Sequence, residues 1–281
     1  MNLTIEFRSK KLIIAVITVI LISTWLHSQN NWIQVESFNF EITNIPKELD
    51  GFRIAHLSDL HLPKNAYSIN GIISLIKNQN PDIIVLTGDI IDASADIINC
   101  GLDQLAHGLA EISPTYAVTG NHEYWNGNIA LWRKTLEENN VVVLENKSVE
   151  KKFKGQSFLL VGVEDEQPLS TISTNTYKVS FKPIILLAHR PELWQSYIAD
   201  KNLKPDLIFS GHAHGGQFRI PFWRGLISPN QGILPKTTSG LYNLDNSTKM
   251  IVSRGLGNSI IPIRINNRPH IPIVTLKVKK E

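Results

Sequence analysis

The chain has 281 residues, 42% of them hydrophobic, and its 28 basic and 25 acidic residues leave a formal net charge of +3. A chain of this length buries a substantial core, which we take to be that of one large domain. The balanced charge gives no support for binding nucleic acid. The single cysteine, Cys100, excludes an internal disulfide framework and any multi-thiolate metal site.

The first thirty residues resemble an export signal or a membrane anchor. Arg8, Lys10 and Lys11 precede an uncharged apolar stretch from Leu12 to Leu26. About 15 residues rise roughly 22 Å as a helix, less than the ~30 Å hydrocarbon core, which leaves a cleavable signal peptide open. Because no convincing small-x-small cleavage site follows Ile22, we favour an uncleaved anchor over residues 1–30 and one catalytic domain over residues 31–281. The basic cluster predicts that this domain faces outward from the cell membrane.

Short apolar runs alternate with helical patterns beyond the anchor, which is typical of an α/β sheet covered by helices. Helices are predicted over residues 67–79 and 98–112, where isoleucine and leucine recur at helical spacing. Five predicted strands each run into a carboxylate, amide or imidazole. These strands cover residues 52–57, 83–87, 116–119, 184–188 and 207–210.

The polar residues that follow the five strands form the candidate site. In chain order they are Asp59, His61, Asp89, Asp92, Asn121, His122, Glu123, His189, His212 and His214. Since the carboxyl ends of parallel strands collect at one edge of a sheet, these side chains are predicted to meet in a single cleft. Gly88, Gly120 and Gly211 would permit tight turns and a close approach of the backbone. Each short motif alone is also an ordinary turn or helix cap, but the set predicts a ligand-binding site.

This ordered series resembles the complete motif series of calcineurin-like metallophosphoesterases, over about residues 38–278. The anchor, Gly215-Gly216-Gln217 and the segment 253–257 are similar to the membrane-associated bacterial branch, which includes enzymes assigned to UDP-2,3-diacylglucosamine pyrophosphate hydrolysis. One departure is Arg268-Pro269-His270, where that branch usually has Arg-Pro-Glu. The resemblance implies an α/β fold of two packed mixed β-sheets flanked by helices.

The resemblance also implies two metal ions that share one carboxylate. It assigns Asp59, His61, Asp89 and His214 to one ion, and Asp89, Asn121, His189 and His212 to the other. Such oxygen and nitrogen ligands without thiolate suit Mn, Fe or Zn.

An imidazole that is not counted as a ligand could protonate the leaving group, and His122 is the candidate general acid. Asp92, Glu123 and Asp165 are candidates for orienting these groups. Structural roles are expected for His27, His56, His107 and His270. For Arg254 a contact with substrate phosphate and a surface ion pair both stay open.

The segment 215–227 has no acidic residue and carries Phe218, Ile220, Phe222, Trp223 and Leu226 beside Arg219 and Arg224. This composition suits either a lipid-phosphate substrate at the interface or a loop that covers the core.

We therefore predict a membrane-bound phosphoesterase that cleaves a phosphate ester or pyrophosphate, such as a UDP-2,3-diacylglucosamine-like lipid. A nuclease or cyclic-nucleotide phosphodiesterase with the same metal site is an alternative, and a catalytically silent scaffold is another. The balanced charge and the anchor disfavour a nuclease, and the intact ligand set disfavours a scaffold. A UDP-linked lipid is cytosolic, so this substrate and the outward topology exclude each other. The choice of monoester, diester or pyrophosphate and the oligomeric state stay open.

Overall fold

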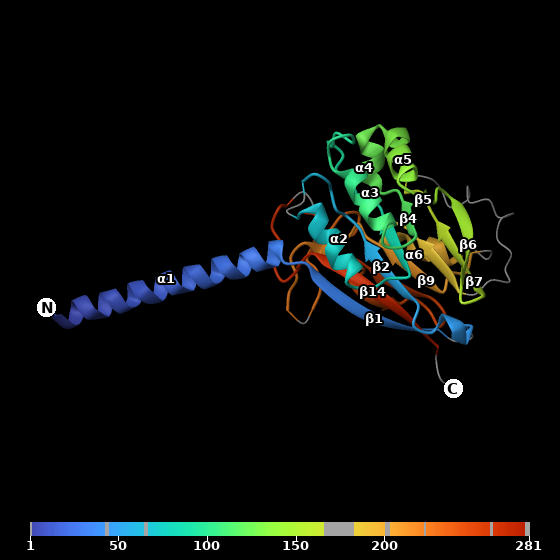
Figure 1. Cartoon of the computed structure of the whole chain (residues 1–281). Coiled ribbons are helices and arrows are strands. Elements are labelled where there is room, and N and C mark those ends of the chain that lie inside the picture. The colour runs from blue at the N-terminus through green and yellow to red at the C-terminus, as the bar shows by residue number, and fades with distance from the viewer. Residues whose placement is uncertain are drawn as a thin grey trace.

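The computed structural model describes residues 2–42, 45–64, 67–165, 183–199, 203–221, 223–258 and 261–278. The first element, α1 (Asn2–Asn31), is one continuous helix that projects away from the rest of the chain (Figure 1). Its segment Lys10–Asn31 has 22 residues and is long and apolar enough to cross a membrane. This length corresponds to about 33 Å, so the helix exceeds the short apolar stretch that the sequence predicts.

Two six-stranded mixed sheets form the centre of the fold. The first has the order β1-β14-β2-β3-β4-β5, in which β14 runs antiparallel to β2 and the other neighbours are parallel. Its strands are β1 (Gln34–Ile42), β14 (His270–Val278), β2 (Arg53–Leu57), β3 (Ile83–Thr87), β4 (Thr115–Val118) and β5 (Val141–Val143).

The second sheet has the order β12-β13-β9-β8-β7-β6 and is antiparallel only at its two outer pairs. Its strands are β12 (Gly240–Asn243), β13 (Lys249–Val252), β9 (Leu207–Ser210), β8 (Ile184–Leu187), β7 (Gln156–Gly162) and β6 (Lys147–Phe153). A short hairpin of β10 (Ile227–Ser228) and β11 (Gly232–Ile233) stands apart from both sheets.

Alternating side chains divide the core into layers. From the first sheet, Leu57 and Leu86 face α2 (Ile69–Lys77), α3 (Leu102–Ala110) and α5 (Ile129–Glu138). Neighbouring residues such as Val85 point the other way and pack against the second sheet. The outer face of the second sheet is covered by α6 (Trp194–Ala199). The resulting order of helices, sheet, sheet and helix confirms the predicted fold class.

The two predicted helices are present but shorter than expected. Ser68 caps the first at its N-terminus by accepting the N–H of Gly71 at 3.0 Å, so α2 begins at Ile69. Gly101 has a left-handed φ of +89°, which places the start of α3 at Leu102. Within the described ranges, the remaining helical elements are α4 (Asn121–Asn126) and the 3-10 turns η1 (Lys47–Leu49), η4 (Pro191–Leu193) and η5 (His214–Gly216).

The five predicted strands are β2, β3, β4, β8 and β9, and they belong to two sheets rather than one. Their carboxyl ends nevertheless meet, because the sheets pack face to face. His189, after β8, donates from Nδ1 to the carbonyl of Thr87 at the end of β3, at 2.7 Å. The prediction that the five strand ends share the edge of one sheet is therefore wrong, and the candidate side chains meet where strand ends of two sheets lie together.

Candidate metal centre

Several residues of the site adopt a backbone conformation that non-glycine residues rarely take. Five of them have a left-handed φ between 45° and 61°: Asp59, His61, Asp89, His212 and His214. Such strain costs on the order of 1 kcal/mol or more per residue and persists where surrounding structure enforces it, commonly at functional sites. The tight turns after β2, β3 and β9 thus direct these side chains inward.

The three predicted glycines serve two different purposes. Gly88 has a φ of +86°, so it supplies conformational freedom. At Gly120 and Gly211 φ is not positive; a Cβ there would instead overlap the Asp89 carboxylate or the side chains of Ser58 and Asp59. Glycine is needed at these two positions because the neighbouring side chains, including the carboxylates of Asp89 and Asp59, approach the backbone too closely for any Cβ.

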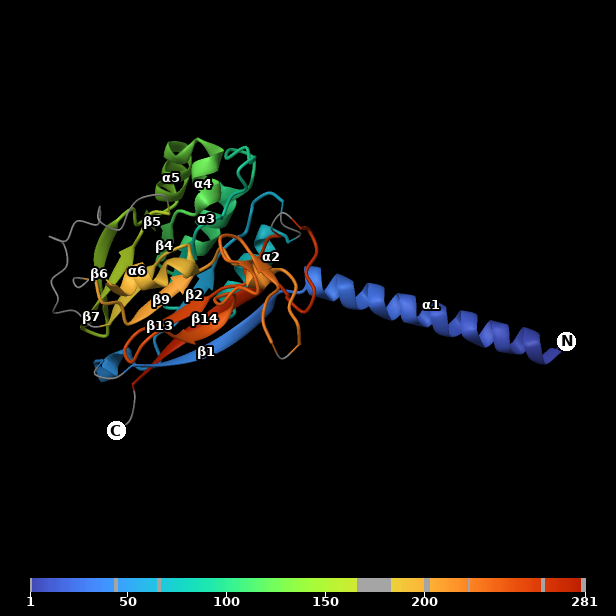
Figure 2. The same cartoon turned by 180° about the vertical axis from the view of Figure 1, so that it is seen from behind.

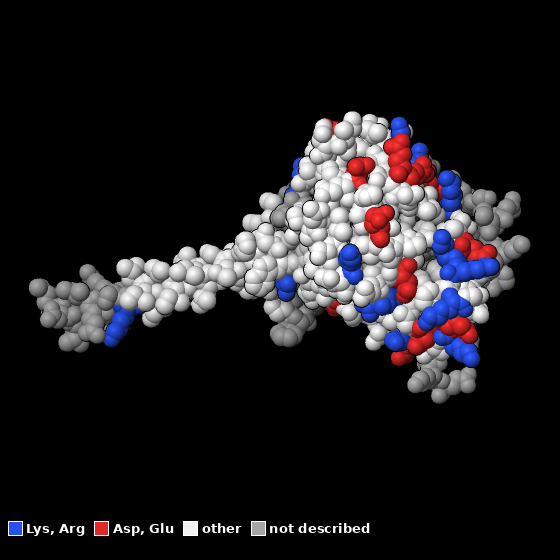
Figure 3. All heavy atoms as spheres, viewed as in Figure 1, with Lys and Arg blue, Asp and Glu red and all other residues white. Residues whose placement is uncertain are grey.

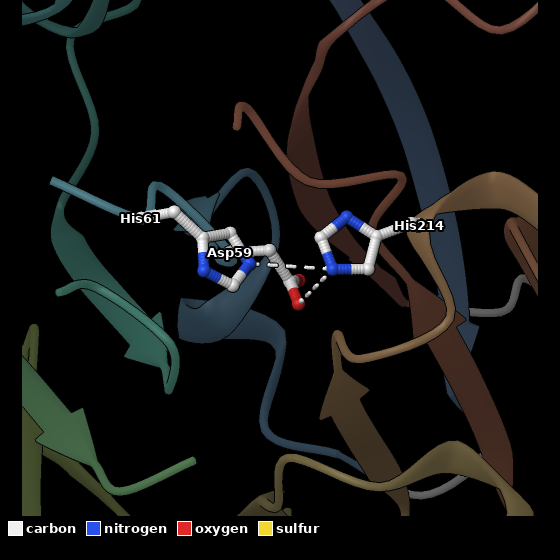
Figure 4. A group of neighbouring side chains, drawn as sticks. All are labelled: Asp59, His61 and His214. Carbon is white, nitrogen blue, oxygen red and sulfur yellow. Dashed lines mark hydrogen bonds and ion pairs between the residues drawn. The ribbon is translucent and has the colours of Figure 1, made fainter. Parts of the chain in front are cut away.

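The first cluster consists of Asp59, His61 and His214 (Figure 4). His214 Nε2 lies 3.5 Å from Asp59 Oδ1 and 3.3 Å from His61 Nε2. Burial lowers the pKa of His61 to about 4 and that of His214 well below its ordinary value, so both rings are neutral at pH 7. Two neutral ring nitrogens and a carboxylate therefore converge on one point.

The second cluster consists of Asp89, His189 and His212. His189 Nε2 lies 3.3 Å from Asp89 Oδ2 and 3.1 Å from His212 Nδ1. Burial lowers the pKa of His212 to about 3. Burial also opposes the charge on His189, but the Asp89 carboxylate outweighs it and raises the pKa of His189 well above its ordinary value.

Asp89 lies between the two clusters. Its Oδ2 is 4.0 Å from His61 Nε2 as well as 3.3 Å from His189 Nε2, and its Oδ1 accepts the N–H of His122 at 2.8 Å. Although burial opposes ionisation, His189 holds the pKa of Asp89 below its ordinary range. Burial raises the pKa of Asp59 to about 7. One ionised carboxylate is thus within reach of both clusters.

These donor groups fit two divalent cations. Asn121 follows β4, and its Oδ1 is buried without a hydrogen-bond partner among the described residues, although an unsatisfied buried oxygen is costly. The neutral rings of His61, His212 and His214 present nitrogen lone pairs, as ligation requires. Asp89 and the Nε2 atom of His189 would hold a cation in place of the proton that a charged His189 carries on this nitrogen. The structure thus brings six of the seven predicted ligand residues into two adjacent clusters, and the seventh, Asn121, lies in the chain between Gly120 and His122, both of which approach Asp89.

His122 lies beside the first cluster and is partly exposed. The N–H of Ala93 donates to His122 Nδ1 at 3.0 Å, which assigns the ring hydrogen to Nε2 in the neutral form. Asp92 Oδ2 is 3.6 Å from the same Nδ1, and the ring centroid of His61 is 4.4 Å away. His61, Asp92 and His122 could also hold a metal ion as a third group.

The predicted supporting carboxylates lie behind the clusters. Glu123 is fully buried and accepts backbone N–H groups of Gly120, Asp89, Ile90 and Ile91 at 2.7 to 3.2 Å. It therefore connects the turn after β3 to the turn after β4.

Asp165 forms a two-pronged ion pair with Arg190, at 2.7 and 2.6 Å. Because Arg190 follows His189 directly, this pair holds the turn after β8.

Two residues near His212 are absent from the predicted site. Asn230 Oδ1 is 3.3 Å and Glu192 Oε1 is 3.7 Å from His212 Nε2. Both carboxylate oxygens of Glu192 are buried without a hydrogen-bond partner among the described residues, and burial raises its pKa. The only sequence signal for Glu192 is its position three residues after His189.

Other candidates lie away from the clusters. Arg254 is buried and forms an ion pair with Glu36 at 3.3 Å, so it is not an exposed phosphate ligand. His270 lies 3.2 Å from the same carboxylate, and His56 bonds Thr87 Oγ1 at 2.7 Å. Both histidines have the structural surroundings that the sequence predicts.

The segment after His214 is only partly buried. Ile220, Trp223 and Arg224 are exposed, whereas Phe218 and Leu226 are half-buried. Phe222, which the sequence also assigns to this apolar loop, lies outside the described residues. The loop therefore presents apolar and basic groups to its surroundings.

Comparison with known proteins gives consistent results. The family model for calcineurin-like phosphoesterase matches residues 52–216, which include all seven predicted ligands. The metallophosphoesterase Cj0846 of Campylobacter jejuni is 31% identical over 96% of this chain and 70% of its own length. The phosphodiesterase YaeI of Escherichia coli is 29% identical over 80% of this chain and 82% of its own.

Two further matches cover less of the other protein. A transmembrane protein with a metallophosphoesterase domain from Danio rerio is 28% identical over 87% of this chain, which spans 57% of that protein. The crystal structure of a 5'-nucleotidase from Candida albicans aligns with a TM-score of 0.50 and 14% identity, over 77% of this chain and 47% of that one. This last match supports the fold alone.

Proposed function

The chain belongs to the calcineurin-like phosphoesterase family, and we propose that the six clustered side chains together with Asn121 bind two divalent cations to hydrolyse a phosphate ester or pyrophosphate of a lipid-linked substrate. Membership makes it a metal-dependent hydrolase of phosphoester bonds. Together with the apolar helix α1, the transmembrane relative indicates that the chain is associated with a membrane. Three statements are proposals: which residues bind the metal ions, that His122 is the general acid, and that the substrate is a lipid.

The observation that carries the ligand assignment is the position of Asp89 within 4.0 Å of one cluster and 3.3 Å of the other. We assign Asp89 as the shared ligand, with the first cluster on one side and His189, His212 and Asn121 on the other. Two cations held there, Mn, Fe or Zn, would supply an activated water and neutralise phosphoryl charge. The protein residues fix the spacing and exclude bulk water, since nearly all of them are buried.

His122 is the proposed general acid. In the neutral ring Nδ1 accepts from Ala93 and Nε2 carries the hydrogen; a second hydrogen on Nδ1 would break the bond from Ala93 and form an ion pair with Asp92, whose Oδ2 is 3.6 Å away. The protonated ring can then donate from Nε2 to the oxygen of the leaving group. Asp92 is itself held by Lys64 Nζ at 2.7 Å and by Ser94, so its carboxylate stays in place beside the ring.

The lipid substrate is proposed because the membrane helix and the segment that follows His214 lie at the same end of the domain (Figure 2). A lipid phosphate could reach this end without leaving the bilayer surface. From Lys10 and Lys11 at the far end of α1, we also propose that the catalytic domain faces away from the cytoplasm. UDP-2,3-diacylglucosamine would then require the reverse topology.

A hydrolysis screen of the full-length, Mn-loaded protein in nanodiscs tests this function. The panel holds phosphomonoesters, phosphodiesters, nucleotide-sugar lipids, lipid phosphates and single-stranded DNA, with Asp89→Ala as the inactive control. We expect turnover of a lipid-linked phosphoester. Preferred turnover of DNA or of a cyclic nucleotide would replace the lipid proposal, and no hydrolysis of any ester would contradict the enzyme itself. Protease added to intact cells tests the topology, because it should digest an outward-facing domain.

A further inference from the structure

The membrane helix is attached to the catalytic domain by specific hydrogen bonds. Only residues 32–33 separate α1 from β1. The Asn30 side chain pairs with the backbone of Arg264: its Oδ1 accepts the N–H at 2.8 Å and its Nδ2 donates to the carbonyl at 3.3 Å. The hydroxyl of Tyr67 donates to the Asn30 carbonyl at 2.6 Å. Helix and domain are therefore held at a defined angle, and a defined face of the domain lies next to the point where α1 leaves it.

The attachment point is firmly connected to the candidate metal centre. The fully buried guanidinium of Arg264 donates to the carbonyls of Arg254 and Gly257 and to Asn258 Oδ1. Gly257 in turn donates its N–H to the carbonyl of Asp59 at 2.6 Å. Because these groups are buried and hydrogen-bonded, the backbone around Arg264, to which Asn30 bonds, is held in place.

Exposed apolar side chains surround this attachment point. We define the anchor-side surface as Trp32, Ile220, Trp223, Ile261 and Ile263, which are between 37% and 58% exposed. Two loops of this surface, which carry Ile220 and Trp223 on one side and Ile261 and Ile263 on the other, are joined by hydrogen bonds.

The amide of Gln217 donates to the carbonyls of Ile261 and Ile263 at 2.5 and 2.7 Å, and Phe218 bridges Ile265. Large apolar side chains held exposed in this way indicate a binding surface rather than a frayed loop.

The charge around the surface is one-sided. On the face seen in Figure 3, charged side chains gather away from α1, and the end next to the helix is mostly uncharged. The sequence has no acidic residue in 207–244 or in 246–280. Arg224 is exposed next to Trp223. Tryptophan, isoleucine and arginine without acidic neighbours suit the headgroup region of an anionic bilayer.

We propose that the anchor-side surface rests on the bilayer, with its tryptophans and isoleucines among the headgroups and Arg224 beside anionic phospholipid. The occupant is lipid because α1, the membrane-spanning candidate, leaves the domain at this same surface. The proposed contact concerns how the domain is oriented on the bilayer and does not depend on which ester is cleaved. An experiment that disproves the contact therefore leaves the proposed hydrolysis untouched, and the reverse also holds.

Site-directed spin labelling of the full-length protein in nanodiscs that contain phosphatidylglycerol tests this contact. Single cysteines replace Trp223, Ile261 or Val142 in a Cys100→Ser background. Val142 is 43% exposed and belongs to β5, a strand that lies away from α1 (Figure 1). We expect labels at 223 and 261 to collide severalfold more with oxygen than with a nickel chelate, and the label at 142 to show the reverse.

Two results would overturn the proposal. Labels at 223 and 261 that are as accessible to nickel as the label at 142 would show that the surface is in water. Labels shielded from both reagents would show a second protein copy in place of lipid.

The Asn30 attachment gives a second, independent readout. Asn30→Ala should keep α1 in the nanodisc and the fold intact, while nickel accessibility at 223 rises severalfold because the domain tilts. The matched control is Asn31→Ala, since Asn31 bonds only His27 within the same helix among the described contacts. If the label at 223 has the same accessibility to nickel in Asn30→Ala as in the parent, the Asn30 attachment does not orient the domain on the bilayer.

Discussion

Glu123 Oε2 accepts the backbone N–H of Asp89 at 2.8 Å, so a buried carboxylate in α4 supports the proposed shared ligand in the turn after β3. The same oxygen accepts from Gly120, and Oε1 accepts from Ile90 and Ile91. Burial and the Asp89 carboxylate raise the pKa of Glu123 to about 7, and the backbone N–H groups that donate to it act in the opposite direction by stabilising its charged form. The position of Asp89 therefore depends on a residue that does not belong to either cluster.

Replacing this support should loosen the site. Glu123→Ala leaves four buried N–H groups without an acceptor, and we expect a loss of about 3 kcal/mol in the free energy of unfolding with weaker metal binding. Glu123→Gln, which retains one carbonyl oxygen, should lose less. Denaturant unfolding and metal titration measure both effects, with the exposed Glu111→Gln as control. Unchanged metal affinity in Glu123→Ala would contradict this supporting role.

The proposed acid can be separated from the ligands. His122→Gln should keep both metals but lose about 10²- to 10⁴-fold in kcat on esters with poor leaving groups, because the leaving oxygen is no longer protonated. Activated aryl esters should be affected far less. The control is the exposed His107→Gln. Equal losses on both ester types, or a loss of metal, would show that His122 is not the general acid.

Buried histidines predict a stability that falls in acid. Burial lowers the pKa of His56 from 6.5 to about 3. Between these values the unfolded chain binds a proton that the folded chain does not, so the free energy of unfolding falls as pH falls through this window. The slope is up to about 1.4 kcal/mol per pH unit for each such histidine. In chelated protein, His56→Gln should reduce the measured slope between pH 6.5 and 4; an unchanged slope would mean that His56 is protonated in the fold.

Membrane contact should matter only for embedded substrates. Trp223→Ser should lower the turnover of a vesicle-embedded phosphoester while leaving a small soluble ester nearly unaffected, because the proposed surface delivers the lipid and does no chemistry. Val142→Ser is the matched control. If Trp223→Ser acts on both substrates like the parent, the proposal of a lipid substrate fails and a soluble envelope phosphoester becomes the better hypothesis.

The sequence predicts the five strands and indicates which residues the fold brings together in two clusters, because both signals are local. Each strand is a short apolar run, and each candidate ligand follows such a run directly. The supporting contacts are different. Glu192 approaches His212, and Asn30 pairs with Arg264 across 234 positions, only after the chain has folded. No local pattern specifies such pairs, and for the same reason the sequence leaves open the ion pair between Arg254 and Glu36.

Metal content is the most direct test of the central claim that Asp89 is shared by two metal positions. The full-length protein, loaded with Mn²⁺ and freed of excess ion, should contain two ions per chain by mass spectrometry. Asn121→Ala should retain about one, since it removes a ligand from one position only. Asp89→Ala should retain almost none and remain folded. Two ions retained in Asp89→Ala, or a single ion in the parent protein, would contradict the account.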